Sequence, residues 1–155
     1  MTAWFEDIEV GAKDSFGRYE VTREEVIGFA SKYDAQPFHL SDEGAAPTHF
    51  RRLAASGWHT GSMMMAMTVA RMQERPGVQE SSLGAIGIDE LRWLRPVYPG
   101  DILRCESEVL EKIPSRSKPD RGVVRVLTTV INQDDAPVMT MIAILIIRTR
   151  PDDPA

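Results

Sequence analysis

Two side chains between residues 33 and 40 have the types and the spacing that suit proton transfer. Asp34 supplies a carboxylate and His39 an imidazole, five residues apart, with Pro37 between them. Proline fixes its own φ angle and pushes Gln36 toward an extended conformation, so the segment cannot be one continuous helix. We therefore expect Asp34 and His39 to meet across a bend, where they form either an acid/base pair or an ordinary turn.

The elements expected before this bend are a strand and a helix. Residues 15–20 alternate aromatic and polar side chains, which predicts a strand. Thr22 followed by Glu25 matches a capping box, and the apolar residues within 26–33 fall on one face of a helix. A short helical turn is expected at residues 42–46.

A second, longer helix is expected to begin near Trp58. Residues 58–73 carry one charged side chain, Arg71, and are apolar on nearly every face, which predicts a helix buried all round. Its methionine cluster is expected in the core, although flexible methionines would also suit a variable acyl pocket. Pro76 and Gly77 are expected to stop the helix.

The second half of the chain is predicted to form a sheet. Four strand-like runs are separated by turn segments rich in Pro, Gly and Asp: residues 84–94, 101–113, 123–132 and 138–149. Their succession predicts an antiparallel meander. Its apolar face needs cover, and the long apolar helix is the candidate, so the expected fold class is α+β with the sheet wrapped around a buried central helix.

Composition sets limits on the kind of protein this is. A length of 155 residues fits one domain, residues 1–155, with residues 1–4 and 150–155 expected to be frayed tails. The net charge of −5 and the scattered arginines argue against nucleic acid as a partner. The longest apolar run, residues 138–147, is too short to span a bilayer, so no membrane association is expected. The start does not read as a secretory signal, which predicts a cytoplasmic location.

Cysteine and histidine usage gives no sign of a metal or other cofactor. The single cysteine, Cys105, excludes an intramolecular disulfide and is expected to be a buried small apolar residue. The histidines lack the i, i+4 spacing of a helical zinc site. His49 is expected to be exposed, and His59 to lie in the core or to line a pocket.

Three motifs give the chain a resemblance to the MaoC-like dehydratase family, the (R)-specific enoyl-CoA hydratases. They are Asp34-x-x-Pro37-x-His39, similar to D-x-N-P-x-H; Ala55-Ser56-Gly57-Trp58, standing where the family usually has A-H-G-M; and residues 91–101, similar to F-x-x-P-V-x-x-G-D. Order and spacing agree over about residues 5–150. The departures are Gln36 for Asn, Ser56 for His, and Met65 where some members carry a hydroxyl.

The resemblance implies the hot-dog fold and a lyase of fatty acid metabolism. Such an enzyme adds water reversibly across the 2,3 double bond of an enoyl-CoA thioester and gives a 3-hydroxyacyl thioester. His39 is then the base, because imidazole exchanges protons near neutral pH, and Asp34 holds the water and handles the proton delivered to C2. The Gly57 N–H, at the start of the central helix, is the oxyanion donor, and glycine would let the thioester approach the backbone.

Four further residues are expected to bind the acyl-CoA substrate, namely Gln36, Ser56, Trp58 and His59. For Ser56 a helix cap through its hydroxyl is the plainer alternative. Because a single wrapped sheet leaves an edge and an apolar face uncovered, a homodimer or higher homo-oligomer is expected.

Two other functions remain open on the same fold. A hot-dog thioesterase is disfavoured because many of these enzymes place a carboxylate on the central helix, whereas residues 58–73 contain no Asp or Glu. A non-catalytic module that binds acyl thioesters is the other alternative, suggested by the three departures from the family motifs.

Overall fold

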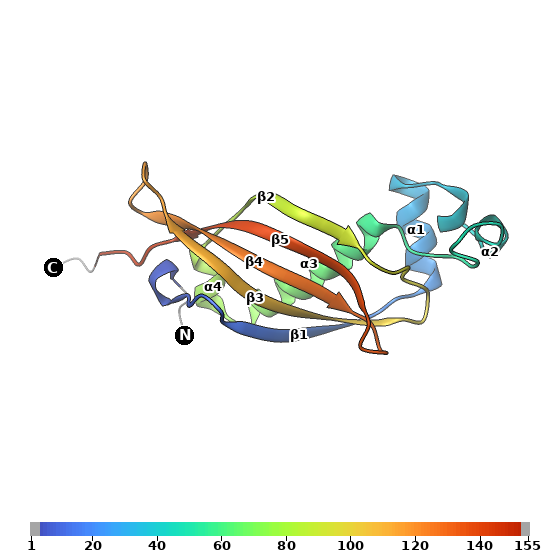
Figure 1. Ribbon diagram of the computed structural model, residues 1–155, viewed down its shortest axis with the longest axis horizontal. Coiled ribbons are helices and arrows are strands. Elements are labelled where there is room, and N and C mark those ends of the chain that lie inside the picture. The colour runs from blue at the N-terminus through green and yellow to red at the C-terminus, as the bar shows by residue number, and fades with distance from the viewer. Residues whose placement is uncertain (1–3, 153–155) are drawn as a thin grey trace.

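The computed structural model describes residues 4–152, and their main feature is a five-stranded antiparallel sheet curved around one long helix, α3 (Figure 1). The elements, in chain order, are η1 (Phe5–Asp7), β1 (Lys13–Glu20), α1 (Arg23–Tyr33), η2 (Pro37–His39), α2 (Asp42–Ala45), α3 (Gly57–Gln73), α4 (Pro76–Ser81), β2 (Ser82–Trp93), β3 (Ile102–Pro114), β4 (Arg121–Ile131) and β5 (Pro137–Arg148). The expected α+β architecture is confirmed. Figure 1 places α1 and α2 together at one end of the sheet, beside the start of α3.

The strand order is β1-β3-β4-β5-β2, with every neighbouring pair antiparallel. The predicted four-stranded meander is therefore correct for β3, β4 and β5 but wrong for β2. After α3 and α4 the chain enters the sheet beside β5, so β2 becomes one edge and β1 the other. The physical reason is that α3, which stands between β1 and β2 in the chain, packs across the sheet, so β2 joins at the edge opposite β1. Residues 94–101 then lead from β2 past β5 and β4 to β3.

The core lies between the sheet and α3. Met63, Met64 and Met67 of the helix are buried against strand residues such as Leu103 and Met139. Cys105 is also buried, as expected, and burial raises the pKa of its thiol to about 12. The methionine-rich side of α3 is therefore core.

The opposite side of α3 is open, which corrects the expectation of a helix buried all round. Trp58 is 62% exposed, Met65 48% and Val69 40%. A helix apolar on every face needs cover on every face, and the sheet of this one chain covers only part of it. An uncovered apolar stripe remains.

Two local features differ from the sequence expectations. Pro76 does not simply stop the long helix, because it occupies the first turn of the additional helix α4, where its missing N–H costs nothing. The tails are shorter than expected among the described residues, since Trp4 is buried and the backbone N–H of Arg150 donates to Glu6. The outermost positions expected to fray, residues 1–3 and 153–155, lie outside the described residues.

Candidate active site

The expected bend between Asp34 and His39 forms at the end of α1. Asp34 is the C-cap residue of α1, and Gln36 adopts the extended conformation (ψ 145°) that the following proline imposes. Pro37 then starts the single turn η2, which ends at His39. The bend brings the two side chains together: Asp34 Oδ2 lies 3.5 Å from His39 Nε2.

The His39 ring is held in one orientation by a hydrogen bond and by packing. Its Nδ1 lies 2.7 Å from the carbonyl oxygen of Ala54, and a carbonyl can only accept, so Nδ1 carries the proton. In the neutral imidazole, Nε2 then carries no proton, and its lone pair faces Asp34. Phe38 packs edge-on against the buried ring, with ring centroids 4.6 Å apart.

The Asp34 carboxylate is held at both oxygens. Gln36 Nε2 donates to Oδ1 and the Ser56 hydroxyl donates to Oδ2, each at 2.7 Å. Burial by itself would raise the pKa of Asp34, but these two hydrogen bonds, together with the charge that His39 carries when its ring is protonated, outweigh burial and hold the pKa below its usual value. Asp34 is therefore ionised at neutral pH.

Ser56 stands at the N-cap position of α3 without capping it. Its fully buried side chain makes no hydrogen bond to the first helical amides, because the hydroxyl is engaged by Asp34. The helix-cap interpretation of Ser56 is therefore wrong. Within residues 4–152, the N–H groups of Gly57 and Trp58 have no acceptor. They are unpaired donors at the positive end of a helix.

The structure shows a packing reason for glycine at position 57. A Cβ at this position would lie 2.4 Å from the Trp93 indole, so glycine makes room for that ring. The Trp93 Nε1–H donates to the Gly57 carbonyl at 2.9 Å, and Trp93 also packs edge-on against Trp58 at 5.1 Å. The open N–H of Gly57 is separate from this packing.

A cleft of about 470 Å³ joins these groups. It runs from the Asp34–His39 pair past the start of α3 to the segment after β2. Its lining consists of Asp34, Gln36, His39, His49, Phe50, Ala55, Gly57, Trp58, Thr60, Trp93, Leu94, Arg95, Pro96 and Val97. Both members of the expected dyad and the expected oxyanion donor therefore face one space.

The four expected substrate-binding residues divide into two groups. Gln36 and Trp58 line the cleft, whereas Ser56 and His59 are absent from its lining. His59 is buried and stacks on Phe29 with ring centroids 4.7 Å apart, and its Nδ1 has no hydrogen-bond partner among the described residues. Burial lowers the pKa of His59, against the charge of Glu25. The core alternative for His59 is the one observed.

Nine of the lining residues were not anticipated as site residues, among them Thr60, Trp93 and Arg95. Trp93 and Arg95 belong to the third motif, which the sequence indicated only as part of the family resemblance, with no role assigned at the site. The exposed side chain of Arg95 forms no ion pair with any residue from 4 to 152. The sequence signal that could have identified Arg95 was its place, as an arginine, in a motif that borders the candidate site.

The third motif also holds the cleft together. Asp101 accepts a hydrogen bond from the backbone N–H of Tyr98 at 2.9 Å, which fixes the turn after β2. The Val97 carbonyl accepts from the Ala55 N–H at 2.8 Å, and the Tyr98 hydroxyl donates to the Phe50 carbonyl at 2.7 Å. These bonds tie the turn to the segment that carries Ser56 and Gly57.

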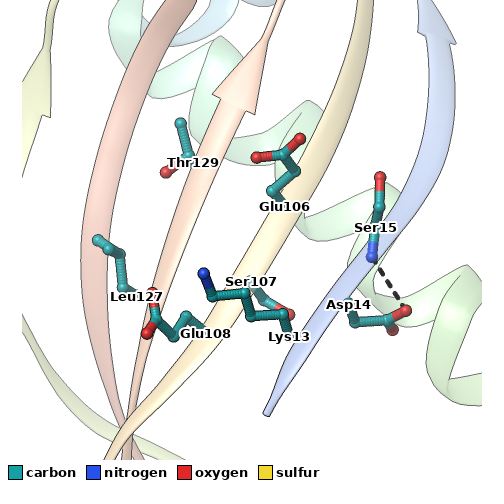
Figure 2. A pocket seen from close by; sticks show the side chains of 8 residues that line it. All are labelled: Lys13, Asp14, Ser15, Glu106, Ser107, Glu108, Leu127 and Thr129. Carbon is teal, nitrogen blue, oxygen red and sulfur yellow. Dashed lines mark hydrogen bonds between the residues drawn. The ribbon is translucent and has the colours of Figure 1, made fainter. Parts of the chain in front are cut away.

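A second hollow, of about 450 Å³, lies on the sheet away from this site. Figure 2 shows that most of its side chains project from β1, β3 and β4 on the side away from α3. The Asp14 carboxylate in its lining accepts hydrogen bonds from the Arg71 guanidinium at 3.0 Å. The lining of this hollow contains no histidine, whereas the cleft at Asp34 pairs a histidine with a carboxylate, so that cleft is the candidate active site.

Two kinds of feature are absent from the described residues. No group of three or more His, Cys, Asp or Glu side chains between residues 4 and 152 converges as a metal site. In the same part of the chain, no helix has both the length and the apolar character that a membrane crossing requires.

Comparison with known proteins places the whole arrangement in context. Residues 9–132 match the family model of the MaoC-like domain. The chain is 36% identical, over 74% of its length and 69% of the relative's, to the 3-hydroxybutyryl-CoA dehydratase of Methylorubrum extorquens. Among solved structures it resembles a MaoC-like dehydratase from Rhodospirillum rubrum, with a TM-score of 0.86, 36% identity, and coverage of 96% of this chain and 99% of that one. It also resembles R-hydratase PhaJ1 from Pseudomonas aeruginosa, with a TM-score of 0.71, 32% identity, and coverage of 96% and 86%.

Proposed function

This chain belongs to the MaoC-like dehydratase family, a hot-dog family of hydratases and dehydratases, and from that premise we propose that its substrate is an enoyl-CoA thioester. The reaction is reversible addition of water across the 2,3 double bond to give a 3-hydroxyacyl thioester. The observation that carries the proposal is the 3.5 Å approach of Asp34 Oδ2 and His39 Nε2 in the cleft that also contains Gly57.

The pair is arranged to hold one water molecule by both of its hydrogens. Because Nδ1 of His39 donates to Ala54, Nε2 presents a lone pair, and Asp34 is an acceptor because it is ionised. Two acceptors facing each other suit a water that donates one O–H to each. Such a water turns its own lone pair toward the cleft, where C3 of the substrate must lie.

The proton balance closes within the pair. As the C3–O bond forms, one O–H bond of water breaks and its proton passes to His39. Negative charge gathers on the thioester oxygen as the double-bond electrons move toward C2. When the enolate collapses, the proton on His39 Nε2 passes to Asp34 Oδ2 and from there to C2, so both residues return to their starting states and the product contains all the atoms of water.

The thioester oxygen needs donors where this charge gathers. The unpaired N–H groups of Gly57 and Trp58 at the start of α3 supply two, with the positive end of the helix behind them. Gly57 also lines the cleft. We assign its N–H as the oxyanion donor.

Coenzyme A as the carrier is supported by the charge at the cleft. Arg95 lines it and is not neutralised by an ion pair with any residue from 4 to 152. A free guanidinium suits the phosphates of coenzyme A, since arginine binds phosphate through two parallel hydrogen bonds. The relative from Methylorubrum extorquens is likewise a dehydratase of a CoA ester by name.

We also propose that the active unit is a homodimer. The exposed apolar side of α3, which includes Met65 and Val69, lies open, and the edge strand β2 exposes Ile86 and Ile88. Ile88 pairs with the core residue Ala143 and therefore lies on the same face of the sheet as α3. A second copy meeting this face would cover the apolar stripe and the open edge together.

The proposal is tested by incubating the purified protein with a panel of enoyl-CoA esters, beginning with crotonyl-CoA, and following the loss of the conjugated thioester's absorbance. Hydration to a 3-hydroxyacyl-CoA is the expected result. Release of free thiol without hydration would identify a thioesterase, and binding without turnover a non-catalytic module. Either outcome would overturn the proposal.

A further inference from the structure

The buried hydroxyl of Ser56 has one described partner, and that partner is the catalytic carboxylate. Ser56 is fully buried, its Oγ lies 2.7 Å from Asp34 Oδ2, and it makes no capping bond to α3. The hydroxyl of an N-cap serine ordinarily accepts a hydrogen bond from a backbone N–H in the first turn of the helix. Here the backbone places the hydroxyl beside a residue 22 positions earlier in the chain.

The Ser56 hydroxyl donates to the carboxylate oxygen of Asp34 that belongs to the dyad. Oδ2 is the oxygen that faces His39 Nε2 at 3.5 Å, whereas Gln36 binds the other oxygen, Oδ1. The two donors at 2.7 Å leave the carboxylate little freedom to rotate. Ser56 therefore fixes both the direction in which Oδ2 points and its distance from His39.

We propose that Ser56 is a positioning residue for the hydration reaction, holding Asp34 Oδ2 in the ionised, water-accepting orientation opposite His39. This inference rests on the proposed function. It reassigns Ser56 from substrate binding, since the residue does not line the cleft, and from helix capping, since its hydroxyl is engaged elsewhere.

The proposal has a consequence for pH dependence. A hydrogen bond donated to a carboxylate favours the charged form, so removing it raises the pKa of Asp34. The groups facing Asp34 are His39 on η2, Gln36 in the bend and Ser56 before α3, while His49 and Arg95 line the same cleft. Replacing Ser56 by alanine removes one neutral donor from this set of groups and leaves all of its charges in place.

The experiment compares Ser56→Ala, Ser56→Thr and Ser62→Ala with the wild type. Ser62→Ala is the matched control, because that hydroxyl on the same helix donates to the Trp58 carbonyl at 2.8 Å and does not touch Asp34. For Ser56→Ala we expect kcat to fall about 10- to 100-fold, the loss expected for a hydrogen bond to a charged group. KM should change little, and the part of the pH profile that reports protonation of Asp34 should move to higher pH. Ser56→Thr, which keeps the hydroxyl, should restore most of kcat, and Ser62→Ala should match the wild type.

A second readout separates this inference from the function on which it rests. The Asp34 carboxyl is titrated by NMR in protein with labelled aspartate side chains, and its signal is assigned by its loss in Asp34→Asn. We expect Ser56→Ala to raise the midpoint of this titration whether or not any thioester is turned over. An unchanged midpoint, or a Ser56→Ala variant with wild-type kcat and pH profile, would overturn the positioning role. A wild-type protein inactive on every thioester, with the midpoint still raised, would overturn the proposed function alone.

Discussion

Asp34 and His39 face each other across 3.5 Å between Oδ2 and Nε2, each acceptor held by bonds to other parts of the chain. His39 is held through Nδ1 by the Ala54 carbonyl, and Asp34 through both oxygens by Gln36 and Ser56. A direct hydrogen bond between two acceptors would need an added proton, whereas a water molecule satisfies both without one. Under the proposed function, this arrangement is prepared for water addition before any substrate arrives.

Replacing Gly57 by alanine should damage both stability and turnover. The new Cβ would meet the Trp93 indole at 2.4 Å, so either the ring or the helix start must move. We expect a loss of about 1–3 kcal/mol in the free energy of unfolding, together with a large loss of activity because the amide donor shifts. Urea denaturation and the hydration assay measure the two effects.

Gly61→Ala is the matched control for that substitution. It lies on the same helix, and a Cβ there meets nothing within 4 Å. Alanine should therefore raise the free energy of unfolding by up to about 1 kcal/mol through helix propensity and leave turnover unchanged. Equal behaviour of the two alanine variants would contradict the close packing assigned to Gly57.

The Asp14–Arg71 pair should make the fold sensitive to acid. The hydrogen bonds from Arg71, opposed by partial burial and helped by the charge of Arg75, lower the pKa of Asp14 in the folded protein. Because the folded pKa lies below the unfolded one, the stabilisation is present above the unfolded pKa of about 3.9 and is lost as pH falls through the folded value.

Asp14→Asn should accordingly lower the Tm at neutral pH and have a progressively smaller effect as the solution is acidified through this range. Thermal melts over a pH series measure it. Glu74→Gln is the control, since Glu74 is a mostly exposed partner of the same Arg71, and its removal should cost less. A Tm difference for Asp14→Asn that stays constant down to low pH would contradict the assignment.

The proposed dimer should depend on the β2 edge. Ile88→Lys places a charge on the exposed apolar face beside α3, and we expect it to shift the protein toward monomer in size-exclusion chromatography with light scattering. Ile113→Lys is the matched control, because Ile113 is similarly exposed but lies near the end of β3, far from β2 in the strand order. A wild type that is monomeric at micromolar concentration would contradict the dimer.

The local elements were predictable because their signals are local. The Thr22 cap, the break at Pro37 and the long apolar run after Ser56 each depend on neighbouring residues, and the structure confirms a helix, a bend and a second helix in those places. The convergence of Asp34 and His39 also follows from a short segment with restricted φ and ψ angles.

The remaining features depend on contacts between distant parts of the chain. The Asp34–Ser56 bond and the Trp93–Gly57 contact join residues 22 and 36 positions apart, and spacing carries no information about such pairs. The pairing of β2 with β5 depends on the path of α3 across the sheet. The open side of α3 was missed because an apolar helix face reads the same in sequence whether its own sheet or a second copy covers it.

The most direct test of the water-holding pair is the hydration rate of crotonyl-CoA for the wild type, Asp34→Asn and His39→Gln. Each substitution preserves the approximate size of the side chain and removes its proton acceptor, so we expect each to lower kcat by about 10²- to 10⁴-fold while the fold, followed by circular dichroism, is kept. Because the two residues hold the same water, the double variant should be little slower than either single one. A wild-type rate in either single variant would contradict the account.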